Sequence, residues 1–322
     1  MNTFIEIQGI SKTFKEKEIL TDTTLTLNKG EILSLVGASG SGKSTFLRIL
    51  SGLESATQGK VLIEGNDISS IRPQNRPIGM VFQQPLLFPH MNVLENVMYG
   101  LKMKGRRKKE TKERAMDYIE RVGLGEFMHH YPSELSGGQQ QRVSLIRSLI
   151  LKPKLLLLDE PFSSLDLQLR KELRHWVRSI LKEEETTVIF VTHDRDEAYE
   201  MGDRVAVLHD GRFLQIGSPD EIYYRPASPF VASFMSDGLI LRGRQFVHAS
   251  QIKVSSSGQG VLSPKWKGAV KQKRFIAGTN IYEVWVEDLK QKLNLPLDGH
   301  SSLEAVWLYT EEENIQTFHQ EE

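Results

Sequence analysis

The sequence predicts an α/β fold in the first part of the chain, followed by a small, barrel-like β domain. Up to about residue 236, short apolar runs typical of buried strands alternate with segments that have helical spacing. One glycine-rich stretch, residues 37–45, lies between such a strand and such a helix. After Gly238 the long helical patterns end and short alternating segments replace them. We therefore expect two domains, residues 1–237 and 238–322.

Composition and charge exclude several classes of function. Lys plus Arg and Asp plus Glu each total 41, so no net charge draws the chain to nucleic acid or anionic lipid. The absence of cysteine excludes disulfides and thiolate metal sites. No apolar run approaches the roughly 20 residues of a membrane-spanning helix, and the first residues do not resemble a secretion signal. We expect a soluble protein that reaches a membrane only through a partner.

Residues 3–36 have the pattern of β structure. Apolar and polar residues alternate around Ile5 and again around Leu25, as in strands that have one face in water. Phe14 lies in the first loop, where an aromatic ring either stacks on a nucleotide base or packs into the core. The pattern leaves both roles open. A turn at residues 28–30 then leads into the apolar run 32–36, which we expect to be a buried strand.

The next stretch, residues 37–45, is the strongest functional signal in the chain. Its glycines leave room for backbone N–H groups to converge on phosphate oxygens, and the following helix adds the positive end of its dipole. We expect Lys43 to reach the β- and γ-phosphates and the Ser44 hydroxyl to ligate Mg²⁺. The sequence therefore predicts nucleotide binding. The residues expected to contact the nucleotide here are Gly37, Ser39, Gly40, Ser41, Gly42, Lys43, Ser44 and Thr45.

Residues 78–82 form another apolar run, which ends at Gln83. A polar amide at the carboxyl end of a strand lies at the rim where α/β sheets bind ligands. The segment 85–98 that follows mixes apolar residues with proline and histidine. We expect it to form either a docking surface or a segment packed inside the protein.

A helix start is predicted at residues 135–142. Ser136 is a good N-cap, and Gly137 and Gly138 allow another backbone to approach closely. The segment is either an ordinary helix start or a second site where a helix N-terminus receives an anion. Gln139 follows within the same turn.

The apolar strand 155–158 ends in two carboxylates, Asp159 and Glu160. An unpaired buried carboxylate destabilises a fold by several kcal/mol, so a compensating cation is expected, with Asp159 holding Mg²⁺ directly or through water. Glu160 points the other way along the strand and is placed to take a proton from an attacking water. A further strand, 187–192, ends at His193, for which we expect a contact with the γ-phosphate.

The remaining segments complete the predicted fold. A long amphipathic helix is expected at 167–183 and a hairpin at 205–216 with Asp210-Gly211 at its turn. Residues 239–322 contain three of the four tryptophans and alternate like short strands. This pattern favours a small β barrel.

Together these motifs resemble the ATP-binding subunits of ATP-binding cassette (ABC) transporters over about residues 4–236. The resemblance includes the loop 37–45, Gln83, the Leu-Ser-Gly-Gly-Gln run at 135–139, the Asp159-Glu160 pair and His193, in the order of that family. It also includes Ser164-Leu165-Asp166. The resemblance implies a P-loop NTPase cassette with a RecA-like core, an antiparallel β subdomain and a helical subdomain at about 84–150.

The resemblance also implies roles for these residues. Two copies would pair head to tail, with each ATP held between the phosphate loop of one copy and Ser136-Gly137-Gly138 of the other. Water would attack the γ-phosphate in line, polarised by Glu160, while Lys43 and Mg²⁺ neutralise charge and His193 orients the water. Gln83 would sense the metal and relay to the transporter through residues 84–98. Asp166 would act across the dimer, and Phe14 would stack on adenine, where Tyr or Trp is commoner.

The C-terminal extension indicates which group of ABC importers the chain resembles. It is similar to the extension of importers for ferric iron, polyamines, sulfate, molybdate and maltose. Its length of roughly 85 residues is shorter than in sugar importers, and it resembles the ferric-iron and polyamine types most, with ferric iron preferred to polyamine. We thus expect an ATPase at the cytoplasmic face of the membrane that works with a permease and, indirectly, a solute-binding protein. A cassette ATPase acting on DNA or ribosomes, and an ATP-binding switch without turnover, are the alternatives. The intact Asp159, Glu160 and His193 argue against the switch.

Overall fold

The computed structural model describes residues 3–105, 108–163, 165, 167–242, 244–257, 264–276, 278–297 and 304–318. The chain divides into two compact units, residues 1–219 and 220–322, each described by itself below. The domain boundary expected at 237/238 stays a prediction. Within the ranges given above, no helix has both the length and the apolar character needed to cross a membrane.

The centre of the first unit is a six-stranded sheet in the order β10-β9-β3-β8-β7-β6. All neighbouring strands run parallel except the β10 edge, which is antiparallel to β9. Parallel strands present their carboxyl ends at one edge of a sheet, so the residues that follow β3, β6, β7 and β8 meet there. The strands are β3 (Ile32–Val36), β6 (Ile78–Val81), β7 (Leu155–Asp159), β8 (Thr187–Val191), β9 (Arg204–His209) and β10 (Arg212–Gly217).

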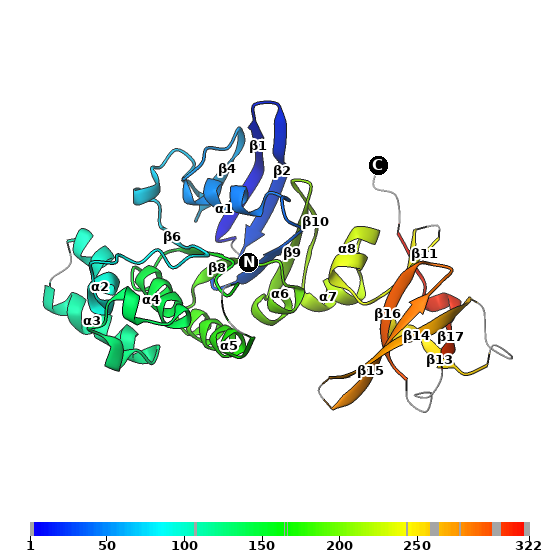
Figure 1. The fold of residues 1–322 in the computed structure, drawn as a ribbon. Helices are drawn as coiled ribbons and strands as arrows, with labels where there is room; N and C mark the ends of the chain where they lie inside the picture. Colours follow the sequence, from blue (N-terminus) through cyan, green and yellow to red (C-terminus); the bar gives the residue numbers. More distant parts are fainter. Residues whose placement is uncertain are drawn as a thin grey trace. The chain divides into compact units, whose positions relative to one another are not determined.

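A second, antiparallel sheet in the order β2-β1-β4-β5 lies beside helix α1 (Lys43–Ser51), as Figure 1 shows in blue. Phe46 and Leu47 of α1 are fully buried in one core with Ile7 and Leu27 of this sheet and Leu157 of β7. Burying a large apolar side chain contributes about 1.5–3 kcal/mol, so this core fixes the helix that follows the phosphate loop. The strands are β1 (Ile5–Phe14), β2 (Lys17–Leu27), β4 (Gln58–Ile63) and β5 (Asn66–Asp67).

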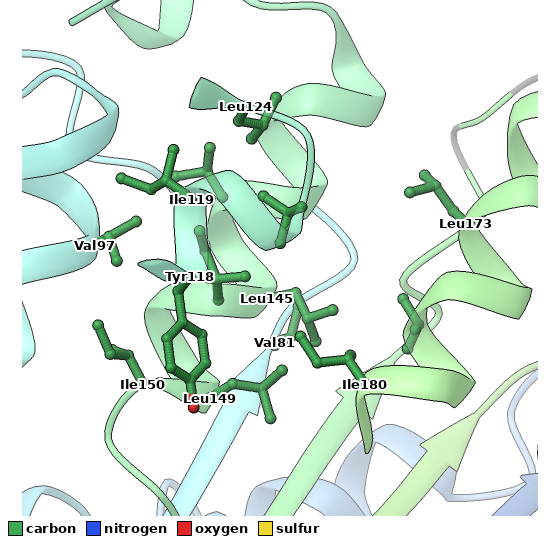
Figure 2. Close-up of a cluster of buried hydrophobic side chains, with 14 of the residues drawn as sticks. Val81, Val97, Tyr118, Ile119, Leu124, Leu145, Leu149, Ile150, Leu173 and Ile180 are labelled. Carbon is green, nitrogen blue, oxygen red and sulfur yellow. The ribbon is translucent and has the colours of Figure 1, made fainter. Parts of the chain in front are cut away.

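Helices form the rest of the first unit. A single apolar core joins Tyr118 and Ile119 of α3 to Leu145 and Leu149 of α4 and to Ile180 of α5 (Figure 2). Helix α4 is therefore packed as a rigid element between its neighbours. The elements are η1 (Pro73–Asn75), α2 (Val93–Met103), α3 (Lys108–Arg121), η2 (Gly125–Phe127), η3 (Pro132–Glu134), α4 (Gly137–Leu149), α5 (Leu167–Glu183) and α6 (Arg195–Met201).

The second unit is mainly antiparallel β structure, as the sequence predicts. Its sheets have the orders β11-β12-β18 and β13-β17-β14-β15-β16, and inward-facing residues such as Trp266, Val284 and Leu308 form their core. The elements are α7 (Pro219–Tyr224), α8 (Pro229–Met235), β11 (Gly238–Leu241), β12 (Gln245–His248), η4 (Ala249–Gln251), β13 (Lys253–Ser255), β14 (Lys265–Ile276), β15 (Thr279–Val286), β16 (Gln291–Pro296), β17 (Ala305–Tyr309), η5 (Glu312–Asn314) and β18 (Gln316–Thr317).

Candidate functional site

The loop between β3 and α1 has the backbone of a phosphate cradle. Gly40 and Gly42 have φ values of 82° and 105°, in the left-handed region that favours glycine. A Cβ atom at Gly37 would lie 2.2 Å from the Leu208 carbonyl oxygen, so this position also has no room for a side chain. The glycines predicted for the loop are thus required by its geometry.

Lys43 is held inside this loop. Its ammonium donates hydrogen bonds to the carbonyl oxygens of Gly37 at 2.7 Å and Ala38 at 2.9 Å, and the residue is buried. Burial lowers its pKa, and the negative charges of Glu160 and Asp159 partly oppose that shift. The charge is therefore concentrated at the loop's inner side, where an anion would satisfy it better than carbonyl dipoles do.

A cavity of about 490 Å³ opens onto this loop. Glu160 and His193, two of the candidate catalytic residues, line it. Lys17 and Ile19 of β2 line it as well, although the sequence analysis did not single them out. Residues two apart on a strand share a face, so the alternation of β2 is the signal that could have paired them. The remaining lining residues are Ser39, Gly40, Gly42, Lys43, Ser44 and Thr45.

Other predicted site residues lie outside that cavity's lining. Among the residues that the structure describes, Phe14, Gln83 and Ser136 do not line it. The Phe14 ring is 44% exposed, and the Lys12 ammonium lies 4.6 Å from its centre. Asp166, predicted to act across a dimer, lies outside the described residues.

Glu160 and His193 contact each other at the mouth of the cavity. The Glu160 Oε1 to His193 Nδ1 distance is 3.2 Å. Glu160 has a φ of 45°, uncommon for a residue with a side chain, and its N–H donates to the Val191 carbonyl at 3.0 Å. This strained backbone fixes the carboxylate at the end of β7, directly beside the end of β8.

His193 is held between β8 and α6 by its neighbours. The Thr192 hydroxyl donates to Glu197 at 2.7 Å and accepts from the Asp194 N–H at 3.0 Å. The Asp194 carboxylate caps α6 by accepting from the N–H groups of Asp196 and Glu197. These contacts fix the backbone on both sides of the histidine while its side chain stays 64% exposed.

Asp159 is the second carboxylate at the end of β7. Burial raises its pKa, the neighbouring Glu160 raises it further, and Lys43 and Arg48 oppose the rise. A carboxylate in this position favours a bound cation. Carboxylate, hydroxyl and amide oxygens are the donors that Mg²⁺ prefers, and this ion commonly uses only one or two protein ligands beside phosphate and water. The predicted donors Asp159, Ser44 and Gln83 fit that chemistry.

No cluster of three or more His, Asp or Glu suited to a metal occurs in the described part of the chain. A magnesium ion bound mainly through phosphate and water does not need one. The predicted donors Asp159, Ser44 and Gln83 therefore fit a metal that arrives with a nucleotide.

Replacing Asp159 with asparagine should stabilise the protein in the absence of nucleotide. Because the folded-state pKa of Asp159 is raised, its ionised form opposes folding above that pKa, and the opposition disappears as pH falls below the unfolded value. We expect Asp159→Asn to raise the unfolding temperature by about 2–4 °C at pH 7, and this gain should vanish near pH 3. Calorimetry at both pH values checks this, and an equal gain at both would contradict it.

The Gln83 side chain forms a hydrogen bond with the loop that follows Glu160. Its side-chain amide donates to the Ser163 hydroxyl at 3.1 Å, and that hydroxyl donates to the Glu160 carbonyl oxygen at 3.1 Å. Two strand ends, β6 and β7, are thereby connected by side chains. Ser163 was not among the residues predicted for the site.

The helix start at Ser136 has the predicted geometry. The Ser136 hydroxyl accepts from the Gln139 N–H at 3.3 Å, and the Gln139 side chain accepts from the Ser136 N–H at 2.8 Å. Ser136 and Gly137 are exposed, and a Cβ atom at Gly137 would have no neighbour within 4 Å in the part of the chain that the structure describes. This helix end therefore faces open space and is accessible to another molecule.

Comparisons with known proteins agree with this geometry. A family model described as ABC transporter matches residues 20–163. The sulfate/thiosulfate import ATP-binding protein CysA of Bacillus cereus is 45% identical over 256 residues, which cover 78% of this chain and 71% of that protein. The Fe(3+) ions import ATP-binding protein FbpC of Photorhabdus laumondii is 45% identical over 237 residues, which cover 74% of this chain and 68% of that protein.

Solved structures of ATP-binding cassettes are similar to about two thirds of the chain. One is a dimeric ATP-binding cassette in a post-hydrolysis state bound to ADP and Pi, with 32% identity, a TM-score of 0.60, and coverage of 66% of this chain and 98% of that one. Another is CbiO1 from Clostridium perfringens, part of an ABC transporter complex, with 27% identity, a TM-score of 0.64, and coverage of 69% and 91%.

Proposed function

The chain belongs to the ABC transporter family, and on this premise we propose that it powers uptake of a small oxyanion through a separate permease. It is an ATP-hydrolysing transport ATPase and the ATP-binding subunit of an import system. For ATP hydrolysis, the observation that carries the proposal is that Glu160 and His193, 3.2 Å apart, line the same cavity as the phosphate loop.

In this proposal the predicted site residues have separate roles in ATP hydrolysis. Loop N–H groups and Lys43 bind the β- and γ-phosphates. Glu160 takes a proton from the attacking water, and His193 holds that water and the γ-phosphate in line. Magnesium, when bound, would neutralise charge that develops on the phosphoryl oxygens, with Ser44, Asp159 and Gln83 as its protein ligands. Adenine stacking by Phe14 stays a prediction.

A second copy of the chain would complete the site. Ser136 and Gly137 are exposed and stand apart from the cavity of their own chain. Free N–H groups at a helix start bind anions well. We propose that they close over the γ-phosphate bound to the partner's loop, head to tail, as the dimeric form of the similar cassette supports. A role for Asp166 across that dimer stays a prediction.

We propose a groove in the first unit as the permease's docking site, which would place the chain at the cytoplasmic face of a membrane. The groove has a volume of about 930 Å³. Leu86 and Met103 in its wall are 57% and 68% exposed. Among the described residues, its lining includes Lys104 and Arg147 but no Asp or Glu. An apolar permease segment with an acidic side chain fits such a surface. This favours docking for residues 84–98, although Phe88 also packs internally on Tyr99.

The transported solute is proposed to be sulfate or a similar oxyanion. The sequence pattern favoured ferric iron, and one relative named above imports Fe(3+). The sulfate/thiosulfate relative matches at the same identity over a longer segment, 256 residues against 237. A solute-binding protein would deliver the anion to the permease from the other side.

Uptake in a strain that lacks this gene tests the proposal. Uptake of labelled sulfate should be lost, should return with the wild-type gene, and should not return with Glu160→Gln. Labelled ferric iron serves as the matched comparison and should enter at the parental rate. Normal sulfate uptake in the deletion strain would overturn the assignment, and loss of iron uptake alone would favour the iron importer.

A further inference from the structure

Arg147, near the end of α4, forms hydrogen bonds with the loop that follows Gln83. Its guanidinium donates to the Leu86 carbonyl oxygen at 3.0 Å and to the Pro85 carbonyl oxygen at 3.4 Å. It also lies over the Phe88 ring, 5.5 Å from the ring centre. Burial lowers the pKa of Arg147, so these contacts partly replace the water that the guanidinium has lost. Arg147 was not among the residues predicted for the site.

In the first half of this loop, the contacts of Arg147 act together with the packing of Leu87 against the apolar core. Leu86 is 57% exposed and has a φ of 46°, an uncommon conformation for a leucine. Two residues later, at Phe88, the backbone is held in a different way. Phe88 donates its N–H to the buried Asn96 side chain at 2.9 Å and accepts from it at 3.2 Å. Among the described residues, Arg147 therefore supplies the side-chain hydrogen bonds to the backbone between Gln83 and Phe88.

The helix that carries Arg147 also carries Ser136 at its start. The two residues are eleven positions apart, or about 16 Å along an α-helix. The buried face of α4 packs into the core shown in Figure 2, so the helix is held as one rigid element. Arg147 therefore connects the loop after Gln83 to the same rigid element whose start we propose to face the second copy's ATP.

We propose that Arg147 is a positioning residue that couples Gln83 to helix α4, so that Gln83 reaches the phosphate and its metal only when α4 is seated. This inference rests on the proposed function, because it assigns Gln83 to the ATP site. Arg147 also lines the docking groove, so a permease segment in that groove contacts the same guanidinium. The coupling thus links three places: the groove, Gln83 and the start of α4.

A double-mutant cycle on ATP hydrolysis tests the coupling. Removing a positioning contact lowers kcat by up to about 10²-fold without weakening ground-state binding. We expect Gln83→Ala to lower kcat about 20-fold and Arg147→Met about fivefold, each with KM for ATP within about twofold of wild type. Because Arg147 acts through Gln83, the double variant should be no slower than Gln83→Ala alone. Both variants should also raise the Mg²⁺ concentration needed for half-maximal rate.

Matched variants separate positioning from a general effect on the fold. Arg142 lies on the same helix and donates to the Val122 carbonyl oxygen at 3.0 Å, away from the Gln83 loop. Arg142→Met should keep kcat and the Mg²⁺ requirement near those of wild type. Arg147→Lys keeps the charge but lacks the planar fork, so it should recover only part of kcat. If Arg147→Met fails to fold, Arg147→Lys takes its place in the cycle.

The proposal would be overturned if the fold-decrease in kcat of the double variant equalled the product of the decreases in the two single variants, and if the Mg²⁺ concentration needed for half-maximal rate were unchanged. Arg147 would then only support the fold. The wild-type rate in the same assay keeps this outcome distinct from failure of the proposed function, which would appear as a wild-type protein that does not hydrolyse ATP.

Discussion

Replacement of Glu160 with glutamine is expected to lower the steady-state rate of ATP hydrolysis by about 10²–10⁴-fold. The amide has the size of the carboxylate and still reaches His193, which lies 3.2 Å from Glu160. It cannot accept the proton that the attacking water must lose. The loss should therefore fall on kcat, and ATP binding should be retained. Phosphate release measures the rate, and equilibrium binding of ATP measures the affinity.

The control for this variant is Glu183→Gln on α5. Glu183 is also a carboxylate, is 68% exposed, and pairs with Arg121 away from the cavity. The Glu183→Gln variant should hydrolyse ATP at the wild-type rate. Turnover by Glu160→Gln within a few-fold of wild type would show that another group activates the water.

Replacement of Lys43 with methionine should weaken ATP binding by about 10–150-fold. A hydrogen bond to a charged group contributes about 1.5–3 kcal/mol, and Lys43 is the buried ammonium inside the loop. Methionine has a similar length but carries no charge and donates no hydrogen bond. Titration with a fluorescent ATP analogue measures the change in Kd.

Lys29→Met is the matched control, because Lys29 is 66% exposed and pairs with Glu185 outside the cavity lining. Its Kd should match that of wild type. An unchanged Kd for Lys43→Met would mean that the phosphates bind elsewhere, which would contradict the cradle proposed for residues 37–45.

The parts of the fold set by local pattern could be predicted from the sequence. The strands β3, β7 and β8 are short apolar runs that are almost wholly buried, and such runs between helices predict a parallel sheet. Once the sheet is parallel, its strand ends must share one edge. The meeting of Glu160 and His193 follows from that topology, although they are far apart in the sequence.

Contacts between side chains from distant segments could not be predicted. No local pattern pairs Arg147 with the carbonyl groups of Pro85 and Leu86, because those groups are common to every residue. The left-handed backbone of Glu160 is equally hidden, since glutamate rarely adopts it. For Phe14, periodicity left stacking and packing both open, and an exposed ring beneath Lys12 keeps its role a prediction.

The central proposal is an ATP site completed by a second copy, and interchain cross-linking tests it most directly. The chain has no cysteine, so Ser39→Cys in one tagged copy and Gly137→Cys in another supply the only thiols. In the Glu160→Gln background, MgATP should bring the two engineered cysteines together, and oxidation should then form a disulfide between the two copies. With ADP, this disulfide should not form. Failure to form it with MgATP, or equal yields with and without nucleotide, would contradict a head-to-tail site.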